Sequence, residues 1–427
     1  MKNHLAVTIL LALLATIGSL CAQDSVTTFA GQRLVNGHSN GPAATATFND
    51  PAALAADAAG NFYIADSQNH VIRKIGTNGI VSTFAGQMAV PGSQDGSGLL
   101  AQFDTPCGIA IGPGGEFYIS DTGNHTLRKI TPTGVVTTIA GRPGENGFTN
   151  GSGGSARFNS PLGLAVGANG TVYVADSGNQ LIREVSSAGT VTTLAGSPEN
   201  WGRDDGMGSA ARFNGPVGVA LDHQGNLMVS DSWNHAIRKI TPDGMVSTWA
   251  GRPGVDGQTD GTALSATFCK PAELALDRWN NLFVADSGNH VIRKISNTGM
   301  VSTVTGRAGA SGAADGYNGA ARFFNPYGLA VTPDGTLLVA DAYNELLRVV
   351  LAPFTLTISK TNASGRAELS WDCAIDRSYQ VQYKDALDSP GWTDLGAPIK
   401  AVSLTVSTMD EVADPTTLRV YRVIRKP

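Results

Sequence analysis

Residues 161–196, PLGLAVGANGTVYVADSGNQLIREVSSAGTVTTLAG, decide the fold, because close copies of this stretch recur along the chain at a constant spacing of 55 residues. A fixed period of this length indicates a repeat protein, in which each unit buries its apolar face against the next one. The clearest marker is an Asp followed three residues later by an Asn. The six copies of the Asp are Asp66, Asp121, Asp176, Asp231, Asp286 and Asp341.

Within one copy the apolar residues alternate with a period of two, which is typical of strands and not of helices. Short runs rich in Val, Leu and Thr occupy residues 162–166, 172–175, 181–182 and 191–195, and turns containing Gly, Asn or Ser separate them. This pattern predicts four short strands in an antiparallel meander. Four-stranded sheets repeated around an axis are the blades of a β-propeller.

The two ends of the repeat region determine the number of blades. The fourth-strand sequence begins at Val26 and recurs five more times, whereas no copy of it follows the last unit after Arg348. The strand at residues 26–30 is therefore expected to complete the blade made by residues 327–349 and to close the ring. We predict an all-β fold: a six-bladed β-propeller over residues 24–352, closed by its N-terminal strand.

Motifs such as DSGNHVIRKI at residues 286–295 resemble NHL repeats over roughly residues 25–350. The long, Gly-rich loops between units are similar to those of bacterial NHL proteins and of the teneurin NHL propeller. The resemblance implies a six-bladed propeller that binds proteins or other ligands. A minority of related six-bladed propellers are lyases or lactonases, so the resemblance favours binding and leaves catalysis open.

The period is lost from residue 353 onward. Residues 353–427 contain alternating segments such as YQVQYKD at residues 379–385 and Pro or Gly turns, which predict a small β-sandwich. This part resembles fibronectin type III or Ig-like modules. We interpret it as an accessory domain for spacing or attachment.

Residues 1–22 have the features of a secretory signal peptide: Lys2, an apolar segment at residues 5–17 and a small-residue end at Cys21-Ala22. The segment is too short for a membrane span. Lipidation of Cys21 is not expected, because the bulky Leu20 precedes it. The sequence therefore predicts a secreted or periplasmic protein.

The three remaining cysteines are Cys107, Cys269 and Cys373. An odd number argues against a disulfide framework, and we expect free thiols. The formal net charge is −5 and no long run of Lys or Arg occurs, so neither nucleic acid nor a membrane surface is an expected partner. We expect a monomer without a cofactor.

The repeated Asp and Asn lie where a turn should join the second and third strands. We expect the Asp to cap this turn, the Asn to be left-handed, and an Arg seven residues after the Asp to pair with it. A residue present in every unit favours a structural role. The histidines that follow the Asn in four units (His70, His125, His235 and His290) lie one per blade, too far apart to share a metal ion, so no metal site is expected.

The innermost strands are almost free of polar residues, which argues against a catalytic channel and for a protein that is not an enzyme. Blade five departs from the pattern, with Glu273 where four other blades have Gly and with Lys270 just before the blade Pro. Together with Tyr327 of the next blade, these residues are expected at the channel mouth. They are either a surface ion pair or part of a ligand site.

Three aromatic residues are expected on the same loop-rich face: Trp233 and Tyr343, where three blades have Gly, and Trp201 in a long loop. They either anchor a ligand or pack onto the loops. The sequence thus predicts a secreted, non-catalytic scaffold that binds an extracellular protein or carbohydrate on this face. The alternative is an extracellular propeller lyase or lactonase with its site at the channel mouth; the ligand itself is not specified.

Overall fold

A computed structural model describes residues 6–10, 18–21, 25–332, 335–351, 355–360, 367–372, 378–384, 391, 393–400, 405–410 and 420–425. The contacts divide the chain into two units. One is Val26–Val350, and the other combines Met1–Ser25 with Leu351–Pro427.

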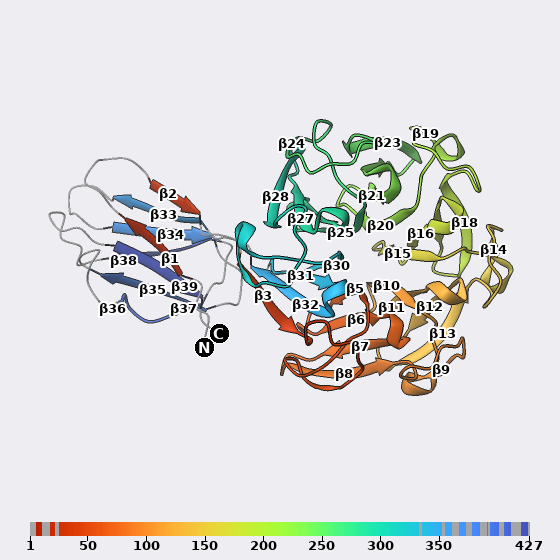
Figure 1. The fold of residues 1–427 in the computed structure, drawn as a ribbon, viewed down its shortest axis with the longest axis horizontal. Coiled ribbons are helices and arrows are strands. Elements are labelled where there is room, and N and C mark those ends of the chain that lie inside the picture. Colours follow the sequence, from red (N-terminus) through yellow and green to blue (C-terminus); the bar gives the residue numbers. More distant parts are fainter. Residues whose placement is uncertain are drawn as a thin grey trace. The chain divides into compact units, whose positions relative to one another are not determined.

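The larger unit consists of six antiparallel sheets of five strands each, arranged around a common centre (Figure 1). We call the strand positions a to e, from the innermost to the outermost. The sequence-based prediction of a nearly all-β, six-bladed propeller is confirmed. Position a is β5 (Pro51–Ala56), β10 (Pro106–Ile111), β15 (Pro161–Val166), β20 (Pro216–Leu221), β25 (Pro271–Leu276) and β30 (Pro326–Val331) in blades one to six.

The next strands follow the repeat. Position b is β6 (Phe62–Asp66), β11 (Phe117–Asp121), β16 (Val172–Asp176), β21 (Leu227–Asp231), β26 (Leu282–Asp286) and β31 (Leu337–Asp341). Position c is β7 (Val71–Ile75), β12 (Thr126–Ile130), β17 (Leu181–Val185), β22 (Ala236–Ile240), β27 (Val291–Ile295) and β32 (Leu346–Leu351). Position d is β8 (Ile80–Ala85), β13 (Val135–Ala140), β18 (Thr190–Gly196), β23 (Met245–Gly251), β28 (Met300–Gly306) and, in blade six, β3 (Ser25–Ala30).

A fifth strand at position e was not predicted. It is a two-residue segment of the long loop that enters each blade, and it pairs with strand d of that blade. The loop therefore covers the outer edge of the sheet before it turns inward to strand a, which protects an otherwise unpaired edge. These segments are β4 (Gly41–Pro42), β9 (Gly96–Ser97), β14 (Gly151–Ser152), β19 (Gly206–Met207), β24 (Gly261–Thr262) and β29 (Gly316–Tyr317).

Short 3-10 helices complete the blades. One group forms the b-to-c turns: η1 (Ser67–Asn69), η3 (Thr122–Asn124), η5 (Ser177–Asn179), η7 (Ser232–Asn234), η8 (Ser287–Asn289) and η10 (Ala342–Asn344). The other group lies in the entering loops: η2 (Gly98–Leu100), η4 (Gly153–Ser155), η6 (Gly208–Ala210) and η9 (Asn318–Ala320). The b-to-c turns and the long d-to-a loops share one face, the loop face, and the a-to-b and c-to-d turns form the opposite turn face.

The ring closes as predicted, through β3 in blade six. The strand order of that sheet is β29, β3, β32, β31, β30, so the first strand of the propeller pairs with its last elements. Val26 and Ala30 of β3 are 1% and 0% exposed. Phe29 contacts Phe62 of blade one edge-to-face, with ring centroids 5.5 Å apart. The closing strand thus contributes to the apolar core on both sides of blade six.

Among the described residues of the propeller, the apolar clusters form between neighbouring blades, and one of them also extends across the channel mouth to blades three and four. The cluster between blades six and one contains Ala30, Leu338 and Leu347 together with Phe48 and Ile64. Such burial between units is the main stabilising term of a repeat protein, because a single blade cannot cover its own apolar face. Every blade therefore depends on its two neighbours.

The smaller unit contains two small antiparallel sheets. One has the order β2 (Gly18–Cys21), β33 (Thr355–Lys360), β34 (Ala367–Asp372), β38 (Thr405–Asp410). The other has the order β1 (Ala6–Leu10), β39 (Val420–Arg425), β35 (Ser378–Lys384), β36 (Thr393–Asp394), with β37 (Ile399–Lys400) also paired to β35. Contacts between the sheets include Trp371 to Tyr379, with ring centroids 6.1 Å apart, and a hydrogen bond that Tyr421 Oη donates to Asp410 Oδ2 at 2.8 Å.

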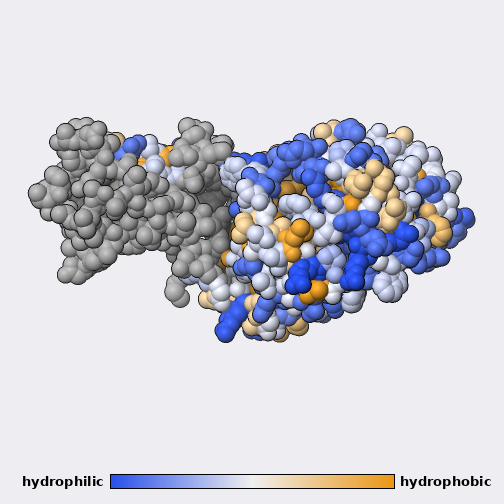
Figure 2. All heavy atoms as spheres, turned by 90° about the horizontal axis from the view of Figure 1, so that it is seen from above, coloured by the Kyte–Doolittle hydropathy of each residue, from blue (hydrophilic) through white to orange (hydrophobic). Residues whose placement is uncertain are grey.

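The surface of the propeller in Figure 2 is mostly hydrophilic, with small separated hydrophobic areas. Among the described residues, no helix is long and apolar enough to cross a membrane. Cys107 and Cys269 are free thiols, as predicted, although both are half-buried. Cys373 lies outside the described residues.

Candidate functional site

The repeated Asp ends strand b in every blade and is completely buried. In blade three, Asp176 Oδ2 accepts hydrogen bonds from Arg183 Nη1 at 2.7 Å and Asn179 Nδ2 at 2.8 Å. Asp176 Oδ1 accepts a bond from the backbone N–H of Asn159 at 2.7 Å. The same three bonds occur in the other five blades.

The paired Arg ties the entering loop to the blade. Arg183 donates to the carbonyl oxygens of Arg157 and Thr149 at 3.0 and 3.3 Å and to Asn150 Oδ1 at 2.7 Å. Its guanidinium carbon lies 5.3 Å from the ring centroid of Phe158. Apart from Nε of Arg183, which has no hydrogen-bond partner among the described residues, the polar side-chain groups of the motif are bonded to partners inside the blade, which supports a structural role.

The residue after the repeated Asn, and not the Asn itself, is left-handed. In blade four Asn234 lies in η7, and His235 has φ of 56°. The Asp also makes no side-chain cap to this turn. Both expectations were wrong for one reason: the Asp and Asn side chains bond to each other and to the entering loop, which leaves the next residue to reverse the chain.

This left-handed residue joins each blade to the next. His235 Nδ1 accepts a hydrogen bond from the backbone N–H of Lys270 at 3.1 Å, just before strand a of blade five. The equivalent acceptors are His70, His125, Gln180, His290 and Glu345, each bonded to the backbone N–H of the next blade. Glu345 bonds to Asp50 and so joins blade six to blade one.

The four histidines therefore have a shared structural environment. Burial lowers the pKa of His125, His235 and His290, which favours the neutral ring whose Nδ1 accepts a bond. Within the residues that the structure describes, no group of three or more His, Cys, Asp or Glu side chains is placed to hold a metal ion.

Glu273 lies on β25 at the loop-face end of the channel and is 8% exposed. In blade four the equivalent residue is Gly218, where an added Cβ would lie 2.5 Å from the carbonyl oxygen of Ala272. Burial raises the pKa of Glu273 to about 8, although a backbone hydrogen bond at Leu274 partly opposes this shift. The carboxyl group is therefore mostly protonated at neutral pH.

The channel mouth around Glu273 is apolar. Leu162, Val217, Ala272 and Tyr327, the residues that follow the blade Pro in four blades, belong to one hydrophobic cluster. Burial raises the pKa of Tyr327 well above its usual range, and the nearby Cys107 and Glu273 act in the same direction. Tyr327 and Glu273 lie on the neighbouring innermost strands β30 and β25, and both side chains remain uncharged at neutral pH.

Lys270 does not join this pair. In the described part of the chain no ion pair links it to Glu273. Its Nζ lies 4.4 Å from the ring centroid of Trp233 instead. The interpretation of Glu273 and Lys270 as a surface ion pair was therefore wrong, because Glu273 is buried and Lys270 faces the aromatic residue.

The three predicted aromatic residues are exposed on the loop face. Trp201 is 70%, Trp233 57% and Tyr343 53% exposed. Trp233 lies against the backbone of Gly215, where an added Cβ would meet its ring, and Tyr343 contacts Phe324 edge-to-face at 5.1 Å. Two of the rings are thus supported on one side and open to solvent on the other, which suits them to ligand contact.

Three blades match the family model described as NHL repeat, over residues 103–130, 158–184 and 213–240. The propeller contains NHL repeats. The chain is 31% identical over 275 residues to the Arabidopsis thaliana protein SUPPRESSOR OF QUENCHING 1, chloroplastic, covering 61% of this chain and 26% of that protein. It is 29% identical over 305 residues to human NHL repeat-containing protein 2, covering 63% of this chain and 42% of that protein.

Solved structures share the fold of the NHL repeats at low sequence identity. An auxiliary nutrient binding protein from Bacteroides ovatus superposes with a TM-score of 0.58 at 16% identity, over 78% of this chain and 77% of that one. This likeness shows the fold. The chain spans less than half the length of the two relatives named above, so their activities do not transfer to it directly.

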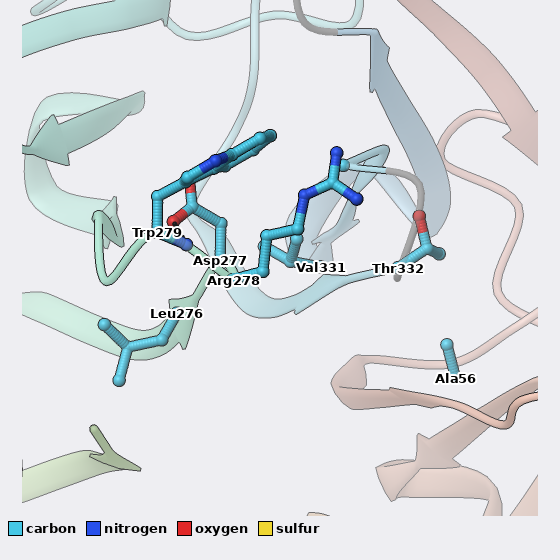
Figure 3. Close-up of a pocket in the computed structure, with 8 residues that line it drawn as sticks. Ala56, Leu276, Asp277, Arg278, Trp279, Val331 and Thr332 are labelled. Carbon is cyan, nitrogen blue, oxygen red and sulfur yellow. Dashed lines mark hydrogen bonds between the residues drawn. The ribbon is translucent and has the colours of Figure 1, made fainter. Parts of the chain in front are cut away.

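Sequence reasoning missed two pockets on the turn face of the NHL propeller. One has a volume of about 220 Å³, and Arg278, Trp279 and Thr332 line it (Figure 3). The other has a volume of about 600 Å³, and Trp279 lines it too. A signal was present in the repeat: blade five has Asn280 at the left-handed turn position where the other five blades have Gly.

Glu273→Gln is expected to stabilise the protein at pH 8 and to leave its stability unchanged at pH 4.5. The folded-state pKa of about 8 exceeds the usual pKa of a Glu side chain, 4.5, so the stability associated with this group is complete below pH 4.5 and is lost as the pH rises toward 8. Removing the ionisation should raise the unfolding free energy at pH 8 by roughly 3 to 4 kcal/mol. Denaturant titrations at both pH values measure this effect.

The control for that experiment is Glu199→Gln, which changes an exposed carboxylate in a loop. It should differ from the parent by less than about 0.5 kcal/mol at either pH. Equal stability of Glu273→Gln and the parent at pH 8 would show that Glu273 is ionised and solvated in the folded protein.

Proposed function

We propose that the NHL propeller is a secreted, non-catalytic scaffold that binds an extracellular protein or carbohydrate through its loop face. One observation carries the proposal: Trp201, Trp233 and Tyr343 are more than half exposed on that face. Rigid aromatic side chains supply a large contact area at a small cost in conformational entropy.

Two further observations support binding. Lys270 lies over the Trp233 ring, which places a positive charge and an aromatic surface side by side. The Bacteroides ovatus protein of the same fold is named an auxiliary nutrient binding protein, which agrees with a binding role for propellers of this kind.

The alternative is an extracellular lyase or lactonase at the channel mouth. One observation favours it: burial raises the pKa of Glu273 to about 8, which suits a carboxyl group to proton transfer, and Glu273 lies at the loop-face end of the channel. The same carboxyl group is enclosed in an apolar cluster, and Lys270 is directed elsewhere. Binding is therefore the better supported function.

The remaining parts of the proposal concern location and the smaller unit. We propose that residues 1–22 are a signal peptide that directs the protein to the periplasm or beyond, and that the mature protein is a monomer. Strands β33 to β39 of the smaller unit are proposed to form a fibronectin type III or Ig-like accessory module over residues 353–427. Strands β1 and β2, which pair with β39 and β33 in these sheets, belong to the proposed signal peptide and are not part of that module.

The combined substitution of Trp233 and Tyr343 by Ala should weaken ligand binding without unfolding the protein. Three blades have Gly at this turn position, so the loss of the rings should leave the melting temperature nearly unchanged. Ligands found on glycan and secreted-protein arrays would be titrated by calorimetry. Their affinity should fall by about 2 kcal/mol or more, roughly 30-fold.

Tyr317→Ala is the control, because it removes an exposed aromatic residue from β29, at the outer edge of blade six and outside both faces. It should leave the affinity for loop-face ligands unchanged. Normal binding by the double variant would contradict the proposed face, and an equal loss in both variants would indicate non-specific adsorption to aromatic residues.

A further inference from the structure

The larger pocket on the turn face lies between blades four and five. Its volume of about 600 Å³ is within the usual range for a small-ligand site. Trp249 and Trp279 supply aromatic surface, and Gln224, Asn280 and Asn297 supply amide groups. Lys239 adds a positive charge to the lining.

The pocket exists where blade four departs from the repeat. Strands b and c place residue 228 opposite residue 239, and the equivalent pairs in blades one, two and five join an aromatic residue to a Lys. The Lys Nζ lies 5.5 to 5.7 Å from the ring centroid in these blades. Blade four has Met228 at this position, so Lys239 has no ring beneath it.

Lys239 is therefore available to a ligand. Among the described residues it has no hydrogen bond, ion pair or ring contact, whereas Lys74, Lys129 and Lys294 each lie over a ring. Asp222, the one carboxylate that lines the pocket, already accepts bonds from Asn226 and Gln224. These bonds come from neutral donors, so the lining carries one acidic and one basic side chain, and of the two only the Lys239 ammonium group has no hydrogen-bond partner among the described residues.

The walls of the pocket are held in place by hydrogen bonds between turns. Asn280 Nδ2 donates to Gln224 Oε1 at 3.0 Å, which joins the a-to-b turns of blades five and four. Asn297 Nδ2 donates to the carbonyl oxygen of Trp279 at 3.2 Å. The Arg278 guanidinium stacks on the Trp279 ring at 4.2 Å, on the side of the neighbouring pocket (Figure 3). These contacts preorganise Trp279 for binding.

We propose that this pocket binds an acidic saccharide, a sugar that carries a carboxylate. The apolar face of a pyranose ring matches the surfaces of Trp249 and Trp279, and its hydroxyls match the amides of Gln224 and Asn297. The carboxylate pairs with Lys239 through a charge-assisted hydrogen bond. This site is separate from the proposed loop-face site.

Calorimetric titration with trigalacturonic acid, and with cellotriose as the neutral probe of equal length, tests the proposal on the full chain. Trigalacturonic acid should bind at least about tenfold more tightly than cellotriose, the factor that corresponds to 1.4 kcal/mol. Absence of trigalacturonic acid binding, or equal affinity for the two probes, would overturn the assignment.

Three substitutions introduce residues that other blades have at the same positions, so each should fold. Met228→Tyr, as in Tyr63, should fill the pocket and abolish binding. Lys239→Glu, as in Glu184, and Trp279→Ala, as in Ala59, should each weaken trigalacturonic acid binding by at least about tenfold. Melting temperatures check that each variant is folded.

Lys294→Glu is the control for charge, because it makes the same change at the equivalent position of blade five, outside the pocket lining. It should leave trigalacturonic acid binding unchanged. A loss equal to that of Lys239→Glu would show a general charge effect, and unchanged binding by Met228→Tyr would show that the sugar binds elsewhere; either result would overturn the proposal.

Discussion

Deletion of residues 24–32 is expected to prevent the propeller from folding into a stable ring. The deletion removes β3, which lies between β29 and β32, so β29 loses its pairing partner and one edge of β32 is left unpaired. Val26 and Ala30 leave two inter-blade clusters at the same time. Truncation of one large buried side chain costs about 3 to 5 kcal/mol, so the loss of a whole strand should exceed about 5 kcal/mol.

Thermal and denaturant unfolding of the truncated protein measure this loss. A synthetic peptide of residues 24–32 should restore part of the stability by adding a strand to the open edge, and a scrambled peptide should not. Thr28→Ala, at the exposed position of β3, removes the hydrogen bond from Thr28 Oγ1 to Asp315 Oδ1 and should lower the unfolding free energy by only about 1 kcal/mol. An unchanged melting temperature after the deletion would contradict closure through β3.

Asp176→Ala is the second prediction with a large expected effect. It leaves the guanidinium of Arg183 fully buried without its carboxylate partner and removes the acceptor for Asn179. Loss of one member of a buried ion pair costs about 3 to 5 kcal/mol, because the remaining charge is uncompensated. Chemical denaturation should show this loss, together with faster proteolysis of the loop that Arg183 anchors.

The control is the double variant Asp176→Ala with Arg183→Met. It removes both charges, so it should be more stable than Asp176→Ala alone if the buried charge is the cause. A single variant that folds as well as the parent but loses ligand binding would contradict the structural interpretation of the repeated Asp.

The number of blades and the closure of the ring could be predicted from the sequence because the repeat is strict. The buried pair of Asp176 and Arg183 requires a fixed register between strands b and c, and this requirement recurs in every unit. The fifth strand could not be predicted. A segment such as Gly206–Met207 has two residues, too few for an alternating pattern, and it becomes a strand because strand d lies beside it.

The candidate site was predictable only in part. The exposed aromatic residues follow from their turn positions, but the direction of Lys270 depends on its left-handed backbone, with φ of 49°, which no local pattern reveals. The turn-face pocket depends on Met228 facing Lys239 across two strands. This relation can be found in the sequence only after the strand register is known.

The first strand of the propeller is a strand d, whereas the meander of each blade begins with a strand a. This offset between sequence repeat and blade affects how such a gene can lengthen by duplication. Each blade combines strands a to c of one sequence copy with a strand d that, in blade six, comes from the opposite end of the chain. Strand β3 precedes the first complete unit. Tandem duplication of any one 55-residue segment therefore adds the strands of a whole blade, and β3 can still pair with strand c of the last blade. A single duplication can therefore encode a ring with one more complete blade, and no intermediate with an incomplete blade is needed.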